Sequence, residues 1–172
     1  LPPAPMITGE HIERIRKDWP GPLVIKGLLH PGDVRLAQQH GADGVVISNH
    51  GGRVLDSTMA PILALPEILE AVNGRATVIV DSGFRRGSDI VKAICLGADW
   101  VGLGRLYCYG LAANGAAGIE RVVELLEEEM KEVMGLLGVT SLKQLDKSYI
   151  TKSTPTNPAG VHSAFPLLHE GY

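Results

Sequence analysis

Short apolar runs alternate with stretches of helical periodicity over most of the chain. The short runs are rich in β-branched residues and are punctuated by glycine, proline or aspartate, which is typical of buried strands. They predict strands over residues 23–27, 44–47, 77–81 and 100–103. Apolar residues at helical spacing predict helices over residues 8–18, 31–40, 59–72, 88–96 and 119–137. This alternation predicts βαβ units and a parallel sheet, and therefore an α/β fold.

The helical periodicity also predicts which side chains face the core. In the first, second and last helices these are Ile12, Ile15, Val34, Leu36, Ala37, Ile119, Val122, Val123, Leu126, Met130, Val133, Met134 and Leu137. Pro61 and Pro66 are expected to break or tilt the third helix. The glutamate run at 127–129 is expected to be a solvated face, with Glu127 paired to Lys131.

Composition narrows the class of protein. With 172 residues, 45% of them apolar, the chain can bury one sizeable core. Its net charge of −3 gives no electrostatic case for nucleic-acid binding. No apolar run approaches the roughly 18 residues of a membrane span, and the N-terminal segment does not resemble a signal peptide.

Because no initiator methionine is present, we expect a fragment, a processed chain or a chain with an upstream part. Cys95 and Cys108 are expected to be buried, reduced thiols.

Chemistry-bearing residues gather in the loop that leaves the second predicted strand. His50 can exchange a proton near neutral pH, and Arg53 can grip a carboxylate with two hydrogen bonds. Between them, Gly51 and Gly52 allow a sharp turn and a close approach to a ligand. This combination favours proton abstraction from a small organic acid.

The other candidate polar residues also follow predicted strands. They are Lys26, Asp81, Arg85, Gly104 and Arg105. In a (β/α)8 barrel the carboxyl ends of the strands carry the active site, and a phosphate site usually follows the last two strands. Four predicted strands are half of what a barrel needs, and alone they would leave two open sheet edges.

The segment Ser48-Asn49-His50-Gly51-Gly52-Arg53, followed by Leu55-Asp56, resembles the active-site signature of the FMN-dependent α-hydroxy acid oxidases and dehydrogenases. The resemblance covers residues 8–150. It implies that residues 1–150 are the C-terminal half, strands 5–8, of a TIM (β/α)8 barrel, and that residues 151–172 are a C-terminal tail. The N-terminal half of the barrel would then be a separate piece, a region beyond this sequence or another chain.

The resemblance assigns a role to each matching residue. His50 would be the catalytic base and would contact the substrate, while Arg53 would bind the substrate carboxylate. Lys26 would lie against the N1/C2=O edge of the flavin, and Ser48 would bond the flavin ring or merely end a strand. Asp81 would bind the ribityl hydroxyls. The phosphate group would be held by Gly83, Arg85, Gly104 and Arg105. Arg86 is expected to pair on the surface, and Ser82 stands where a glycine is common in the family.

The expected reaction is FMN-dependent oxidation of an (S)-2-hydroxy acid, such as lactate, mandelate or glycolate, to the 2-keto acid. Carbanion and hydride mechanisms both stay open, as does the electron acceptor: oxygen, a quinone or a cytochrome. The family resemblance implies a homo-oligomer, often a tetramer, that is cytoplasmic or peripheral on the inner face of the membrane. Two alternatives are a non-catalytic FMN-binding half-barrel fragment and another FMN-dependent barrel enzyme, such as an isomerase.

No metal site is expected, because the remaining histidines lack the spacing of known metal ligands. These are His11, His30, His40, His162 and His169. Trp19 and Trp100 are interpreted as packing residues rather than stacking platforms.

Overall fold

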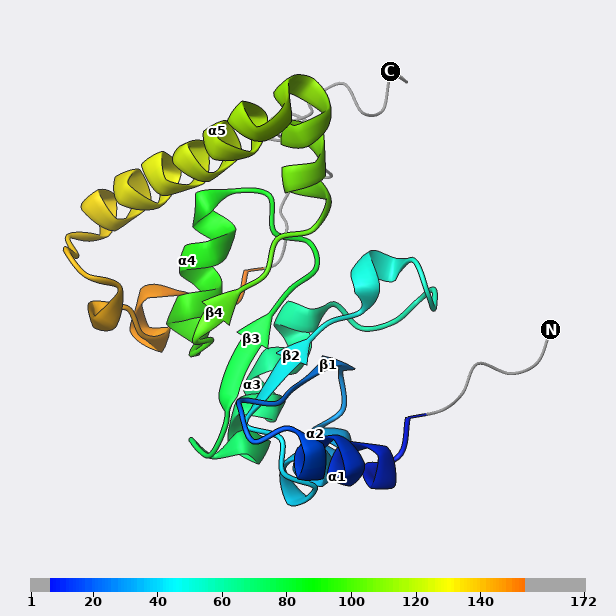
Figure 1. The fold of residues 1–172 in the computed structure, drawn as a ribbon. Helices are drawn as coiled ribbons and strands as arrows, with labels where there is room; N and C mark the ends of the chain where they lie inside the picture. The colour runs from blue at the N-terminus through cyan, green and yellow to red at the C-terminus, as the bar shows by residue number, and fades with distance from the viewer. Residues whose placement is uncertain (1–6, 154–172) are drawn as a thin grey trace.

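The computed structural model of the chain describes residues 7–153 and contains one four-stranded parallel sheet (Figure 1). The strands lie side by side in chain order: β1 (Val24–Leu28), β2 (Gly44–Ile47), β3 (Thr77–Val80) and β4 (Trp100–Val101). Each consecutive pair is parallel, so each needs a crossover connection. The α/β class and the parallel sheet predicted from the alternating pattern are confirmed.

Helices supply the crossovers. They are α2 (Pro31–Gln39), α3 (Pro61–Val72) and α4 (Gly87–Leu96), with α1 (Gly9–Asp18) before the sheet and α5 (Arg105–Leu137) after it. Pro61 occupies the first position of α3, where its missing N–H costs nothing. Pro66 lies inside α3 without ending it, so the predicted break does not occur.

The last helix and the last strand differ from their predictions. β4 has two residues instead of four, and α5 begins at Arg105 rather than at 119. The φ/ψ angles of Asn114 and Gly115 interrupt α5, which bends there in Figure 1. The two arms touch so closely that a Cβ on Gly118 would lie 1.9 Å from the Gly110 carbonyl oxygen. Because several positions between 105 and 118 are glycines, the first part of α5 shows no apolar periodicity in the sequence. The same glycines permit this close contact.

The main core lies between the sheet and its crossover helices. Alternate residues of β2 and β3 point to the same face, and Val45, Ile47, Val78 and Val80 are buried there. The helices cover them with Val34, Ala64, Leu65, Ile68, Val72 and Ala93. Val46 and Ile79 face the other side of the sheet and are only partly buried. In the described part of the chain, β1 and β4 each pair with one neighbour only.

A second apolar cluster joins α4 to α5 and the turns after it. Val91 and Cys95 of α4 are buried against Val139 and Leu145. Polar contacts also join α4 to α5: Glu129 of α5 accepts hydrogen bonds from the Gly87 N–H (2.6 Å) and from Arg86 Nε (2.8 Å). The glutamate run is therefore not a purely solvated face, although the Glu127–Lys131 pair is present at 3.2 Å.

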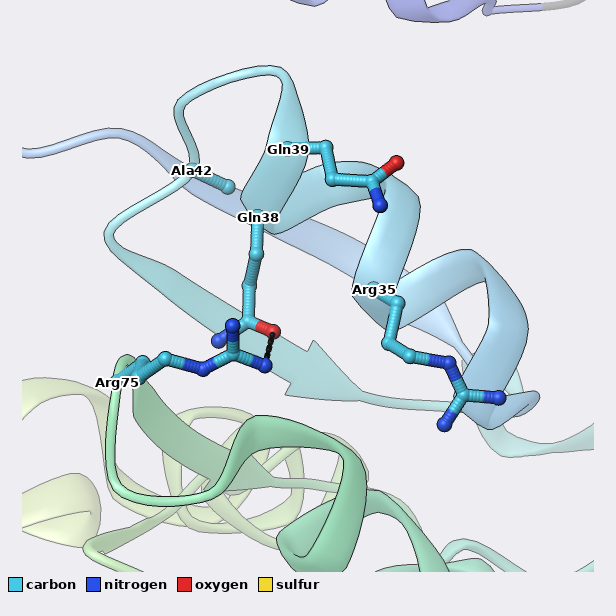
Figure 2. Close-up of a pocket in the computed structure, with 5 residues that line it drawn as sticks. All are labelled: Arg35, Gln38, Gln39, Ala42 and Arg75. Atoms are coloured by element: carbon cyan, nitrogen blue, oxygen red, sulfur yellow. Dashed lines mark hydrogen bonds between the residues drawn. The ribbon is translucent and has the colours of Figure 1, made fainter.

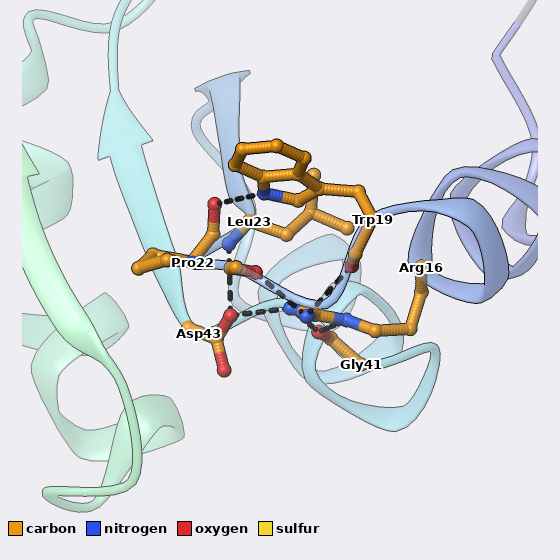
Figure 3. Close-up of polar contacts among 7 residues, drawn as sticks. Arg16, Trp19, Pro22, Leu23, Gly41 and Asp43 are labelled. Atoms are coloured by element: carbon orange, nitrogen blue, oxygen red, sulfur yellow. Dashed lines mark hydrogen bonds and ion pairs between the residues drawn. The ribbon is translucent and has the colours of Figure 1, made fainter.

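The sequence Gly-Ala-Asp occurs twice directly before a strand, at residues 41–43 and 97–99, and its aspartate makes the same hydrogen bond at both places. Asp43 Oδ2 accepts the Leu23 N–H and Asp99 Oδ2 accepts the Val78 N–H, each at 2.8 Å. Each aspartate thereby fastens a strand to the start of the preceding one. Arg16 of α1 adds to the first site by pairing with Asp43 and donating two hydrogen bonds to the Gly41 carbonyl (Figure 3). The hydrogen bond from Leu23 and the Arg16 guanidinium lower the pKa of Asp43.

Several expected inward side chains are exposed. Ile15 and Val123 each lie at the edge of the buried stripe of their helix, whereas Leu36 lies on the side of α2 that faces away from the buried Val34 and Ala37. Cys95 is buried as expected, whereas Cys108 is exposed. Trp100 is 66% exposed on the edge strand β4, and Trp19 is exposed beside the hydrogen bond that its indole donates to the Pro22 carbonyl. Beyond Ser153, the predicted tail at 151–172 lies outside the described residues.

Candidate functional site

Three polar side chains meet where β1, β2 and β3 end. Lys26 lies in β1, while Ser48 and Asp81 directly follow β2 and β3. The Lys26 ammonium donates a hydrogen bond of 2.8 Å to Ser48 Oγ and forms an ion pair with Asp81. The Ser48 side chain is buried, with 1% of the residue exposed. The parallel register thus joins residues that are 55 positions apart in the sequence.

The environment of Asp81 favours its charged form. Partial burial acts to raise the pKa of this carboxyl, but hydrogen bonds from Lys26, Ser48 and Ser82 outweigh burial and lower the pKa below its ordinary value. Its side chain is 20% exposed, against 48% for Lys26. The site therefore holds a fixed carboxylate beneath an ammonium that reaches toward solvent.

His50 stands on a strained turn directly beside this cluster. Its φ of 55° is followed by 68° at Gly51 and 72° at Gly52. A non-glycine residue in this region costs about 1–2 kcal/mol, and such strain concentrates at functional sites. The His50 N–H donates to Ser48 Oγ (3.1 Å), and the imidazole lies over Gly27, whose added Cβ would come 3.0 Å from Cε1.

Two arginines contact the backbone of the same turn. Arg53 Nε donates to the His50 carbonyl at 3.2 Å, so its exposed guanidinium is anchored to the backbone of the turn. Arg105, the first residue of α5, donates to the Gly51 carbonyl at 3.2 Å. The structure therefore brings the end of β4 to the loop that follows β2.

Gly83, Arg85 and Gly104 lie on the exposed loops that follow β3 and β4. A Cβ on Gly83 or Gly104 would meet nothing within 4 Å, so these backbones border open space. Within the described residues the Arg85 side chain makes no hydrogen bond or ion pair. Arg86 instead turns to Glu129, as predicted for a surface pair, and this contact raises the pKa of Arg86. The adjacent arginines thus have different surroundings.

Sequence reasoning missed three residues at this site. Gly27 leaves room for the His50 ring, and Gly102 leaves room for Asp81, whose Cβ would lie 2.9 Å from a Cβ there. Both glycines stand at strand ends next to candidate residues, which is the signal that could have identified them. Ser82 makes hydrogen bonds that connect the loop after β3 to the loop after β2, and nothing in the sequence pattern indicates that contact.

A shallow hollow lies at the opposite end of the sheet, before the starts of β2 and β3 (Figure 2). It is lined by Arg35, Gln38, Gln39, Ala42 and Arg75. Arg75 donates to the Ala71 and Val72 carbonyls and to Gln38, so it closes the C-terminal end of α3. This hollow is remote from the residues that the sequence analysis singled out.

Residues 7–153 contain no cluster of three or more His, Cys, Asp or Glu side chains that could hold a metal ion. Over the same range, no helix combines the length and the apolar character needed to cross a membrane.

Known proteins match the chain over most of its length. Residues 3–152 match the family model of the FMN-dependent dehydrogenases. L-lactate dehydrogenase from Caulobacter sp. (strain K31) is 46% identical over 149 residues, and L-lactate dehydrogenase from Xanthomonas oryzae pv. oryzae (strain PXO99A) is 47% identical over 150. Each alignment covers 87% of this chain and 39% of the relative.

Solved structures agree with these matches. The crystal structure of (S)-mandelate dehydrogenase, described as a monotopic membrane protein, superposes with a TM-score of 0.82 at 40% identity, over 86% of this chain and 39% of that one. Mandelate oxidase gives a TM-score of 0.78 at 44% identity, over 81% and 42% of the two chains. The chain thus spans about two fifths of the length of its relatives. Because the family match extends over nearly the whole sequence, this chain belongs to the FMN-dependent dehydrogenase family.

Proposed function

We propose that the chain is the C-terminal half, strands 5–8, of a (β/α)8 barrel that oxidises an (S)-2-hydroxy acid to the 2-keto acid. The observation that carries this proposal is the convergence of His50, Arg53 and the Lys26–Asp81 pair on one end of the sheet. In (β/α)8 barrels this end holds the active site. FMN, when bound, supplies the acceptor for the two electrons that leave the substrate.

His50 acts as the base. Its ring lies over Gly27 at the end of the sheet where the strands end, and its backbone N–H is held by Ser48. The imidazole therefore has a defined position from which to take a proton. The carboxylate that stabilises the resulting imidazolium comes from the other half of the barrel. Whether the proton leaves the α-carbon or the hydroxyl group is open in this proposal.

Arg53 binds the substrate carboxylate. Its Nε is occupied by the His50 carbonyl, which fixes the guanidinium plane beside the base while its other N–H groups remain to grip an anion. The α-carbon with its hydroxyl group and the carboxylate are neighbours in a 2-hydroxy acid, as His50 and Arg53 are in this turn. Lactate and mandelate, which the names of the relatives indicate, are the first substrates to test.

The residues at the strand ends fit FMN by their donor set. Lys26 presents a half-exposed ammonium that can hold negative charge at the flavin edge, with Ser48 beside it. Asp81 offers carboxylate oxygens to the ribityl hydroxyls. Arg85 and Arg105, with the backbone at Gly83 and Gly104, offer an anion site near the start of α5, where N–H groups favour a phosphate.

The rest of the barrel completes the molecule. Within residues 7–153, β1 and β4 have no further strand at their outer edges, and this, with the half-buried second face of the sheet, supports pairing with a further (β/α)4 half. We include in the proposal a homo-oligomer, an acceptor that is oxygen, a quinone or a cytochrome, and a place in the cytoplasm or on the inner membrane face. The monotopic membrane relative supports the peripheral location.

Anaerobic flavin reduction tests the proposed function. The protein in its full length, with any sequence that flanks residues 1–172, is loaded with FMN and mixed with (S)-lactate or (S)-mandelate. We expect the yellow absorbance to bleach, and His50→Gln to slow bleaching by at least about 100-fold while FMN stays bound. His11→Gln, on the distant helix α1, is the matched control. An FMN-loaded protein that no 2-hydroxy acid bleaches would contradict the proposal.

A further inference from the structure

Ser82 adopts a backbone conformation that is unusual for a serine. Its φ is 74°, in the left-handed region that favours glycine, and it lies between Asp81 and Gly83 in the loop after β3. A glycine would adopt this conformation without strain. Some interaction of the serine side chain must therefore offset the conformational cost of keeping it here.

The Ser82 hydroxyl makes two hydrogen bonds that a glycine could not make. Its oxygen accepts the Gly51 N–H at 3.2 Å, and its O–H donates to Asp81 Oδ1 at 2.8 Å. The first bond reaches across 31 residues to the loop that carries His50. Ser82 thus links the loops that follow β2 and β3.

These bonds close a ring of polar contacts around the site. Asp81 pairs with Lys26, Lys26 donates to Ser48, and Ser48 accepts the His50 N–H. From the next residue, Gly51, the ring returns through Ser82 to Asp81. The His50 N–H of the strained turn is therefore held by the Ser48 hydroxyl, and the next N–H, that of Gly51, is shared between Ser82 Oγ and Asn49 Oδ1.

We propose that Ser82 is a positioning residue for the base: it holds the 50–51 turn in register with Asp81 and so fixes where the His50 imidazole stands. This inference rests on the proposed function. The turn with three successive positive φ angles is also held by Asn49, whose Oδ1 accepts the Gly51 N–H at 3.0 Å, but the bond to Ser82 is what ties the turn to Asp81. A displacement of about 1 Å at a catalytic group can lower the rate about 100-fold.

Two substitutions at position 82 separate the effect of the hydroxyl group from the effect of backbone strain. Ser82→Ala removes the hydroxyl and keeps a side chain at positive φ, whereas Ser82→Gly removes the hydroxyl and also relieves the strain. Ser57 provides a matched control, because its φ is 60° and its hydroxyl makes no hydrogen bond within residues 7–153. Ser57→Ala and Ser57→Gly repeat both changes away from the ring.

The variants are made in the full-length protein and followed by two measurements. Hydrogen–deuterium exchange over residues 49–53, with and without FMN, reports the bond to Gly51, and anaerobic mixing with (S)-lactate or (S)-mandelate reports flavin reduction. We expect both Ser82 variants to exchange at least threefold faster and to reduce flavin at least tenfold more slowly. FMN affinity should stay within threefold. Ser82→Gly should be at least as stable to heat as the parent protein, so that its activity falls while its stability does not.

The outcomes discriminate between the explanations. Unchanged exchange, or faster exchange with flavin reduction within twofold of the parent, would overturn the positioning role. A rate loss equally large in the Ser57 variants would also overturn it. If no hydroxy acid reduces the flavin of the parent protein, the proposed function is contradicted instead. The hydrogen–deuterium exchange measurement would still report whether Ser82 holds the turn.

Discussion

The His50 imidazole lies directly against Gly27, so that a Cβ on Gly27 would approach within 3.0 Å of Cε1. The two residues come from different strand ends, and Gly27 has a φ of 97°. A glycine at this point serves two needs: it allows the backbone conformation and it leaves room for the ring. The His50 imidazole therefore packs against the strand that carries Lys26.

Gly27→Ala should displace the His50 imidazole, which we propose to be the base. The added methyl group presses on Cε1 and must push the imidazole away or distort β1, so we expect flavin reduction by a 2-hydroxy acid to slow at least tenfold. Gly74→Ala is the control, since Gly74 also has a positive φ of 69° but a Cβ there meets nothing within 4 Å. Stopped-flow absorbance compares the two variants. Equal loss of rate in both would indicate backbone strain rather than contact with His50.

Asp81 should contribute to stability in a pH-dependent manner. Its pKa is lowered in the folded protein, because hydrogen bonds from Lys26, Ser48 and Ser82 outweigh burial. Its contribution is therefore complete above the unfolded-state pKa of about 3.9 and is lost as the pH falls through the lower folded-state value. Asp81→Asn should cost about 1 kcal/mol at pH 7, since the Lys26 partner is half exposed, and should flatten the acid limb of the stability curve.

Urea unfolding of the full-length protein at a series of pH values between 7 and the acid limit measures this effect. Asp18→Asn is the control, since Asp18 makes no ion pair in the described part of the chain. An acid limb that is as steep in Asp81→Asn as in the parent would show that the Lys26 pair adds nothing to stability.

The alternating pattern was sufficient to predict the parallel sheet and the order of its strands and helices. Buried β-branched strands and amphipathic helices can be recognised from the spacing of their apolar residues. It was insufficient where glycines replace apolar residues. The first arm of α5 packs through Gly110 and Gly118 by backbone contact, which leaves no periodic signal. Leu36 is exposed because it stands two residues after Val34 and one before Ala37, which places it on the side of α2 away from these buried residues.

The site residues were identified by their position after strands and by resemblance, and the structure brings Lys26, Ser48 and Asp81 together. Their chemical roles stay predictions. The contacts of Ser82 were beyond sequence reasoning, because the partner of a single hydroxyl group depends on the register of neighbouring strands. Register is a property of the folded sheet, in which a shift of one residue would separate all these side chains.

Gly87 should be essential for the packing of α4 on α5. A Cβ there would lie 2.6 Å from both Glu129 Cβ and the Met130 nitrogen, so Gly87→Ala must push the helices apart. We expect a loss of about 1–3 kcal/mol in the free energy of unfolding, as for other overpacked positions. Gly135→Ala is the control, since that glycine lies in α5 with open space around it and alanine should stabilise the helix by about 0.5–1 kcal/mol. Urea denaturation distinguishes the two, and a Gly87→Ala protein as stable as its parent would show that α5 does not pack in this way.

The two adjacent arginines should separate cofactor binding from stability. Arg85 is exposed with no partner for its side chain within residues 7–153, whereas Arg86 is paired with Glu129. If Arg85 and Arg105 hold the phosphate group, Arg85→Met should weaken FMN binding at least tenfold, since a charge-assisted hydrogen bond is worth about 1.5–3 kcal/mol. Arg86→Met should leave FMN affinity within threefold and lower the thermal midpoint, because Glu129 loses its ion pair across α4 and α5 and, in the described part of the chain, keeps only the hydrogen bond from the Gly87 N–H. Quenching of flavin fluorescence on binding and a thermal melt of the apoprotein measure the two effects. The reverse assignment, with FMN affinity dependent on Arg86, would require the loop after β3 to turn its second arginine away from Glu129 when the cofactor binds.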